Sequence, residues 1–166
     1  HSGCGKTNLI EAIAYTANLT NKIPQLSDKT NMTYSMGLVP VEYNGIKYNL
    51  LDTPGNFDYV GEVEAALHVA ESAVIVVPSY RDISIGTKQA MFRAKDKAKI
   101  IYINGLDNPD ANYKEKLNQL KKAYGKGIAP IQVPIMDHDK MIGYINVAKM
   151  EGRIFIPPYD DPKVIA

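Results

Sequence analysis

The first seven residues constrain the fold more than any other part of the chain, because they match a phosphate-binding loop. They read His1-Ser2-Gly3-Cys4-Gly5-Lys6-Thr7, and the full pattern is Gly, four free positions, Gly, Lys, and Ser or Thr. Gly3 and Gly5 allow backbone N–H groups to turn toward an anion. Lys6 supplies a positive charge for the β- and γ-phosphates, and Thr7 supplies a hydroxyl group for a magnesium ion. Phosphate binding is therefore the first prediction.

A helix is predicted directly behind this loop, since apolar residues recur there at helical spacing. These residues are Leu9, Ile10, Ile13, Ala14 and Ala17. The amino terminus of such a helix carries about half a positive charge and favours an anion. Gly-Lys-Thr strings also occur in structural turns, but the helix favours the phosphate-binding interpretation. The first Gly of the pattern would precede His1, so we expect the first strand to be missing and the chain to be a fragment.

The composition is that of an ordinary globular domain of 166 residues, with 45% apolar and 22% charged residues. The net charge of +1 creates no global field that favours a nucleic acid, a membrane surface or an acidic partner. No run approaches the roughly 18 apolar residues of a membrane span. We expect neither a membrane nor DNA as a partner, although the net charge itself argues neither for nor against a nucleic acid. The single cysteine, Cys4, occupies a free position of the loop and excludes an internal disulfide.

Strand-like and helix-like segments alternate along the chain. The strand-like residues 39–43 and 46–51 flank Asn44-Gly45, which is the strongest short signal for a hairpin. Two continuous apolar runs, residues 73–77 and 99–103, are of the kind buried in parallel sheets. The remaining segments are helical patterns at residues 62–71, 86–95 and 110–124, a polar stretch at 18–31 expected to be a mobile loop, and short β-rich pieces beyond Pro130. The elements predict an α/β sheet, mostly parallel, with one antiparallel hairpin.

A second chemical signal, Asp52-Thr53-Pro54-Gly55, directly follows the second hairpin strand. A carboxylate delivered by a strand end beside a phosphate loop can hold a water of the magnesium ion, and the N–H of Gly55 can meet a γ-phosphate. Taken alone, these four residues would be read as a turn. Their position downstream of a phosphate loop, at a strand end and before a helix, favours the magnesium site.

The third signal is Asn104-Gly105-Leu106-Asp107, at the end of the last apolar strand. The carboxylate of Asp107 can accept both N–H groups of a guanine edge, which adenine does not offer. A plain strand-ending turn is the alternative interpretation of these residues. Together with the phosphate loop, the motif favours a guanine-nucleotide site.

These three motifs resemble those of translational GTPases, and most closely the elongation-factor-G-like group. The second motif continues in the family's manner as Asn56-Phe-Asp-Tyr-Val-Gly-Glu-Val63. The similarity extends through three further segments, at residues 82–87, 127–135 and 143–150, and so covers nearly the whole chain. The resemblance implies a phosphate-loop NTPase fold of G-domain type, with helices on both faces of the sheet. It also implies a partial GTP-binding domain at residues 1–130, followed at 131–166 by the start of a G′-like insertion.

The same resemblance implies GTP and GDP as substrate and product, Mg²⁺ as cofactor, the ribosome as partner through missing domains, and a cytoplasmic site of action. By position, the nucleotide-binding residues would be Gly3, Cys4, Gly5, Lys6, Thr7, Asn104 and Asp107. Those near magnesium would be Thr7, Thr33 and Asp52, of which Thr33 matches the switch threonine. Asn56 holds the place of the family's water-positioning histidine, and Gly55 lies beside it.

Three departures from the family pattern bear on activity. Asn56 has a shorter side chain than histidine and is not protonated at neutral pH, and loss of a water-positioning group can cost orders of magnitude in rate. Gly105 replaces the lysine of the guanine motif, so selectivity would rest on Asp107 and binding would be weaker. The segment before Thr33 is also shorter than the family's first switch.

Three functional hypotheses remain open from the sequence. The first is a GTPase domain that uses GTP binding to order its switches and hydrolysis to release them. The second is a degenerate module that binds GTP or GDP without efficient hydrolysis, as Asn56 and Gly105 suggest. The third is an unrelated phosphate-loop ATPase or kinase, against which Asp107 argues.

Overall fold

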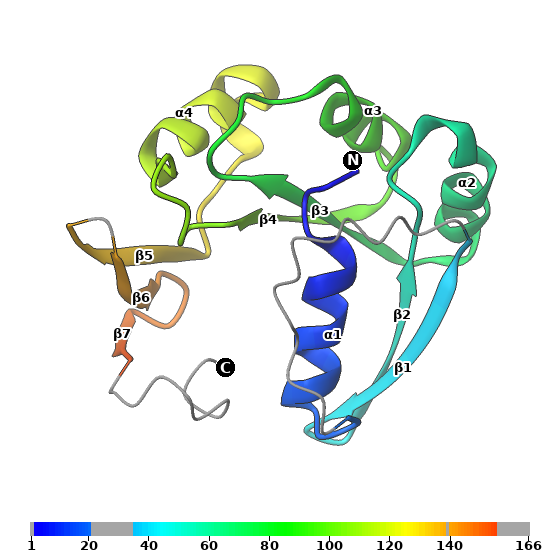
Figure 1. Cartoon of the computed structure of the whole chain (residues 1–166), viewed down its shortest axis with the longest axis horizontal. Coiled ribbons are helices and arrows are strands. Elements are labelled where there is room, and N and C mark those ends of the chain that lie inside the picture. The colour runs from blue at the N-terminus through cyan, green and yellow to red at the C-terminus, as the bar shows by residue number, and fades with distance from the viewer. Residues whose placement is uncertain (1, 21–34, 139, 156–166) are drawn as a thin grey trace. The chain divides into compact units, whose positions relative to one another are not determined.

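The computed structural model of this chain describes residues 2–20, 35–138 and 140–155 (Figure 1). Thr33 and most of the predicted loop 18–31 lie outside the described residues. The elements are α1 (Lys6–Thr16), β1 (Gly37–Tyr43), β2 (Ile46–Asp52), a 3-10 turn η1 (Phe57–Tyr59), α2 (Val60–Val69), β3 (Ser72–Pro78), α3 (Ile85–Arg93), β4 (Ala98–Asn104), α4 (Tyr113–Tyr124), a second 3-10 turn η2 (Gly125–Gly127), β5 (Gln132–Asp137), β6 (Lys140–Asn146) and β7 (Glu151–Ile154). Each predicted helix and strand is present. No helix in these ranges is long and apolar enough to cross a bilayer.

Two compact units make up the chain. The first comprises His1–Val77 and Ser84–Tyr102, and the second comprises Pro78–Ile83 and Ile103–Ala166. The described strands pair in three groups, β1 with β2, β3 with β4, and β5 with β6 and β7. The boundary predicted between a partial GTP-binding domain (residues 1–130) and a G′-like insertion (residues 131–166) stays a prediction.

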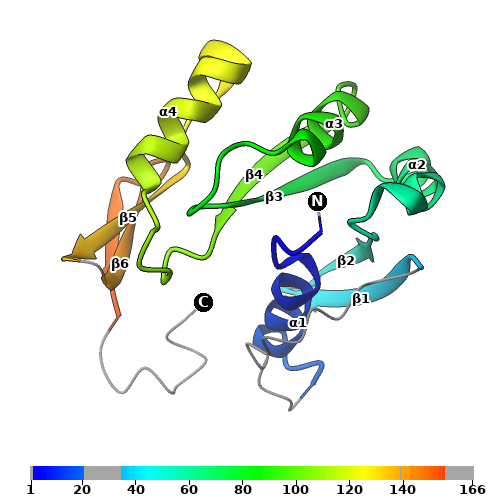
Figure 2. The same cartoon turned by 45° about the horizontal axis from the view of Figure 1, so that its top comes forward.

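The predicted hairpin is confirmed, and its turn explains its register. Asn44 and Gly45 both have positive φ, 53° and 75°, which is the backbone of the two-residue turn that matches the twist of paired strands. The antiparallel register therefore starts at Tyr43 opposite Ile46 and ends with Gly37 opposite Asp52. Helix α1 runs alongside the hairpin in both views (Figures 1 and 2). The hairpin thus carries Asp52 to its far end.

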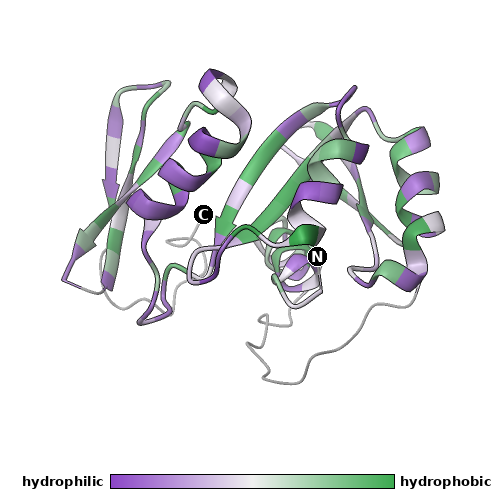
Figure 3. Cartoon of the chain, turned by 90° about the horizontal axis from the view of Figure 1, so that it is seen from above, coloured by the Kyte–Doolittle hydropathy of each residue, from purple (hydrophilic) through white to green (hydrophobic). Residues whose placement is uncertain are grey.

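The core of the first unit lies where β3 meets α3. Ile75, Val77 and Ala94 form the buried cluster, and Leu67, Ala73, Ala90, Met91 and Ile101 pack against it. The pair β3 and β4 is mostly hydrophobic in Figure 3, which fits this position. An ion pair of 2.7 Å joins Arg93 of α3 to Glu64 of α2. Apolar burial is the main stabilising term, because exposed ion pairs contribute little.

The prediction that β4 is buried on both faces is wrong. Ile101 packs against the core, but Ile100 and Tyr102 are 56% and 42% exposed. Successive side chains of a strand point to opposite faces, so Ile100 and Tyr102 share the face that the core does not cover. β3 differs in its second half, since Ile75, Val76 and Val77 are buried, whereas Val74 is 54% exposed. The apolar run of β4 is therefore covered on one face only, and that of β3 is covered fully only from Ile75 onward.

In the second unit, α4 is bounded by two residues with clear physical roles. Asn112 is extended, and its side chain accepts a hydrogen bond from the backbone N–H of Glu115, 2.9 Å away. Because Asn112 caps the helix, α4 starts three residues later than the predicted Asp110. Gly125, with φ of 76°, ends it as predicted. The hydroxyl of Tyr113 donates to the carbonyl of Gln132 at 3.1 Å, which ties α4 to β5.

Candidate functional site

The phosphate loop is built on two left-handed glycines. Gly3 and Gly5 have φ of 72° and 85°, a backbone region that costs other residues roughly 1–2 kcal/mol each. Gly5 is the N-cap of α1, so the first backbone N–H groups of the helix follow it. Cys4 between the two glycines is only 3% exposed. The side chain of Cys4 is therefore buried, and the loop brings backbone N–H groups to the amino terminus of α1, where they can meet an anion.

The structure brings Thr7 and Asp52 together, although 45 residues separate them in the sequence. The hydroxyl of Thr7 donates to Oδ2 of Asp52 at 2.8 Å. Asp52 ends β2 and is 8% exposed. Its other oxygen, Oδ1, is buried and has no hydrogen-bond partner among the described residues. A buried acceptor without a partner costs about 1–3 kcal/mol, so this oxygen is suited to a ligand.

The residues at this point fit a magnesium ion. Mg²⁺ prefers oxygen ligands, and sites that also hold substrate phosphates use only one or two carboxylates from the protein. Asp52 and Thr7 supply such a pair. No group of three or more His, Cys, Asp or Glu side chains that could hold a metal occurs in residues 2–20, 35–138 and 140–155. The donor set therefore favours magnesium shared with phosphates over a metal held by protein ligands alone.

Residues Thr53–Asn56 follow Asp52 as a short connection to η1. Pro54 is buried, whereas Gly55 and Asn56 are half-buried. The amide Nδ2 of Asn56 donates to Oδ2 of Asp58 at 3.0 Å, and the carbonyl of Asn56 accepts from the N–H of Tyr59. Asn56 thus holds the start of η1 through both its side chain and its backbone, a role that the sequence did not suggest.

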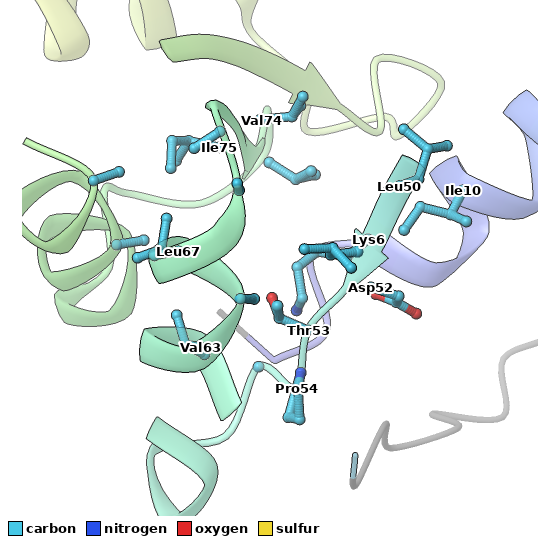
Figure 4. A pocket seen from close by; sticks show the side chains of 18 of the residues that line it. Lys6, Ile10, Leu50, Asp52, Thr53, Pro54, Val63, Leu67, Val74 and Ile75 are labelled. Atoms are coloured by element: carbon cyan, nitrogen blue, oxygen red, sulfur yellow. The ribbon is translucent and has the colours of Figure 1, made fainter. Parts of the chain in front are cut away.

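A cavity of about 800 Å³ lies within the first unit. One end is polar, since Lys6, Asp52 and Thr53 are among its lining residues and are labelled in Figure 4. The remaining walls are mostly apolar, with Ile10, Leu50, Val63, Leu67, Val74 and Ile75 among the side chains that Figure 4 labels. Apolar walls do not bind phosphate, and the loop glycines are not among the lining residues. A phosphate would therefore fit the loop and the polar end, and not the apolar walls.

The guanine motif belongs to the second unit, where the segment after β3 supports it. The backbone N–H of Ser79 donates to the carbonyl of Asn104 at 2.8 Å, and its hydroxyl donates to the carbonyl of Gly105 at 2.5 Å. Gly105 has φ of 73° and begins a turn that the N–H of Asn108 closes. Asp107 is exposed. The loop thus holds Asp107 on a braced backbone and leaves its carboxylate accessible to a base.

One lysine of α4, Lys116, is buried. The pattern of lysines on α4 predicts a solvated helix face, and Lys114, Lys121 and Lys122 are indeed exposed. Lys116 is only 2% exposed, and its Nζ donates to the carbonyl of Arg81 and, at 3.2 Å, to Oε1 of Gln119. Burial lowers the pKa of the Lys116 ammonium, an effect that nearby Asp82 and Glu115 oppose.

Gln119 completes this contact by donating to Oδ1 of Asp82 at 2.9 Å. Helix α4 therefore anchors residues 81–82, and Ser79 anchors the guanine motif to the same segment. Sequence reasoning missed Ser79, Lys116 and Gln119. The available signal was the position of Ser79 directly after an apolar strand, since strand ends carry site residues. The burial of Lys116 has no signal in the sequence.

The chain is similar in sequence and fold to known proteins. The sequence matches the family described as "Elongation factor Tu GTP binding domain" over residues 1–154. An elongation factor G-like protein of Mycobacterium tuberculosis is 30% identical over 164 residues, which cover 90% of this chain and 23% of that protein. An elongation factor G-like protein of Thermotoga maritima is 27% identical over 173 residues, which cover 99% of this chain and 25% of that protein.

A solved structure is also similar. A crystal structure of a Thermus thermophilus protein matches with a TM-score of 0.82 and 27% sequence identity, covering 99% of this chain and 28% of the other. The chain therefore spans about a quarter of the length of the relatives that it matches.

Proposed function

Because this chain belongs to the family of elongation factor Tu GTP-binding domains, we propose that it hydrolyses GTP to GDP and phosphate with Mg²⁺, as part of a translation factor acting on the ribosome in the cytoplasm. The family match and the similar crystal structure confirm the predicted resemblance and the α/β fold class. GTP binding follows from the family. Hydrolysis, the metal and the ribosome are the proposal.

The observation that supports the proposal most is the contact between Thr7 and Asp52. It places a hydroxyl and a carboxylate 2.8 Å apart beside the phosphate loop, with Oδ1 of Asp52 buried and without a partner among the described residues. A magnesium ion bound there would neutralise negative charge on the phosphates. Lys6 and the backbone N–H groups after Gly5 would bind and orient them. Thr33, outside the described residues, stays a predicted ligand.

The proposal is tested by GTP turnover of the purified chain, with and without ribosomes. We expect slow intrinsic hydrolysis that ribosomes accelerate and that chelation of magnesium abolishes. Asn56→His should raise the rate, because histidine can position the attacking water. Asn118→His, at an exposed position of α4, is the matched control and should leave the rate unchanged. A chain that binds GTP but shows no turnover under any of these conditions would refute hydrolysis.

A second candidate, a module that binds GTP or GDP without efficient hydrolysis, is favoured by one contact. The amide of Asn56 is engaged by Asp58, which restrains it from orienting a water. Under this alternative, Asn56→His binds GTP with wild-type affinity and still does not turn it over. Comparison of GTP with ATP in the same assay separates both from an unrelated ATPase or kinase, which would bind ATP at least as tightly.

A further inference from the structure

Gly105 is a glycine for two separate reasons, and the second involves an aromatic ring. Its φ of 73° is left-handed. In addition, a Cβ atom at this position would lie 2.9 Å from Cε1 and 3.3 Å from Cδ1 of Tyr80, and 3.8 Å from the hydroxyl of Ser79. The space in which a side chain of residue 105 would start is therefore occupied by the ring of Tyr80.

Both sequence neighbours of Tyr80, Ser79 and Arg81, are fixed by hydrogen bonds. Ser79, its preceding neighbour, is 4% exposed and makes two hydrogen bonds to the backbone of Asn104 and Gly105. Arg81, the next residue, is bound at its carbonyl by Lys116, and its guanidinium lies 5.2 Å from the centre of the Tyr80 ring. The ring itself is half-buried. It is thus a fixed, partly accessible aromatic surface beside the guanine motif.

We propose that the ring of Tyr80 is the nonpolar contact for the guanine base in this protein. The inference rests on the proposed guanine-nucleotide site. Asp107 can read only the hydrogen-bonding edge of the base, and Gly105 has no side chain to cover a face. Bases stack well on aromatic rings, and the ring of Tyr80 lies against Gly105, two residues along the loop from Asp107. Tyr80 therefore acts as a binding residue, and Arg81 holds the ring in place.

The test compares two ligands, GDP and inorganic pyrophosphate, each with magnesium and measured by calorimetry. Pyrophosphate reports on the phosphate loop alone, whereas GDP also reports on the base. Tyr80→Ala should weaken GDP binding about tenfold and leave pyrophosphate binding unchanged. Tyr80→Phe, which keeps the ring, should stay within about twofold of the wild type. Tyr43→Ala, at an exposed tyrosine of the hairpin (51% exposed), is the matched control.

A double mutant provides the sharper test of the contact. Gly105→Ala should weaken GDP binding in the wild-type background, because the new Cβ displaces the ring. In the Tyr80→Ala background the same change should have a smaller effect, since the ring is gone. The two substitutions should therefore be non-additive. Circular dichroism of each variant confirms that it is folded.

The outcomes separate this inference from the proposed function. If the wild type binds GDP and folded Tyr80→Ala binds it within about twofold, the role of Tyr80 is refuted while the nucleotide site stands. Equal weakening of GDP and pyrophosphate would also refute it, because it would indicate a general structural effect. If the wild type binds pyrophosphate but not GDP, or binds neither, the guanine-nucleotide site itself fails and the inference fails with it.

Discussion

Asp52→Asn should make the protein more stable without ligand and less stable with it. The substitution keeps an oxygen for the hydroxyl of Thr7. It replaces Oδ1, which is buried and has no partner in the described part of the chain, with a neutral amide group. An unpartnered buried polar group costs about 1–3 kcal/mol, and a charged one costs more. We therefore expect the variant to gain about 1 kcal/mol in the free energy of unfolding. For a chain of this size, that gain raises Tm by about 2–4 °C.

Ligand binding reverses the order of stability of the wild type and Asp52→Asn. Wild-type protein at a magnesium–GDP concentration 100 times its Kd gains about 2.7 kcal/mol. If loss of the carboxylate weakens binding 100-fold, the variant gains only about 0.4 kcal/mol at the same concentration. The wild type then becomes more stable than Asp52→Asn by roughly 1 kcal/mol.

Thermal unfolding followed by circular dichroism, with and without magnesium–GDP, measures both effects. Asp96→Asn removes a carboxylate at an exposed position of the first unit and serves as the control, with no change in either condition. The reasoning is refuted if Asp52→Asn is less stable than the wild type without ligand, or if it keeps the full stabilisation by magnesium–GDP.

Three further predictions concern the second unit. Leu120→Ala should lower the free energy of unfolding by about 2–5 kcal/mol in urea titrations, because Leu120 is 1% exposed; a loss below 1 kcal/mol would contradict its place in the core. Gly143→Ala should disrupt the pairing of β6 with β7, since a Cβ there would lie 2.1 Å from the carbonyl oxygen of Arg153; faster amide hydrogen exchange in β7 would reveal it, and unchanged exchange would oppose it. Lys116 has a lowered pKa, so the folded state holds its proton less tightly than the unfolded state. Stability should therefore rise with pH in the window between the lowered pKa and the ordinary lysine value of 10.5. Lys116→Met should remove that rise in urea titrations at several pH values, and an identical slope in both proteins would refute the link.

Local patterns were sufficient to predict most elements of the fold. The hairpin followed from Asn44-Gly45, because few sequences adopt two successive positive φ angles. The end of α4 followed from Gly125 for a similar reason. Its start was wrong because Asn112 competes for the cap, and caps depend on a single side-chain hydrogen bond.

The features that sequence reasoning missed depend on contacts between distant segments. Thr7 and Asp52 could be paired in advance because both belong to recognisable motifs. The burial of Lys116 could not be predicted, since it depends on the carbonyl of Arg81, 35 residues away. Any other backbone carbonyl could have accepted this hydrogen bond. The exposure of Ile100 likewise depends on which elements cover β4, while the apolar run itself looks the same whether covered or not.

The bracing of the guanine motif also has a kinetic consequence. Its hydrogen bonds join residues 26, 35 and 37 positions apart, whereas the helical turns of α4 close over four. Closing long loops costs entropy before any contact forms, so the brace should assemble after α4 during folding and open before it during unfolding. Recognition of the base would therefore arise only after α4 has formed, and it would be lost before α4 unfolds when the chain is heated.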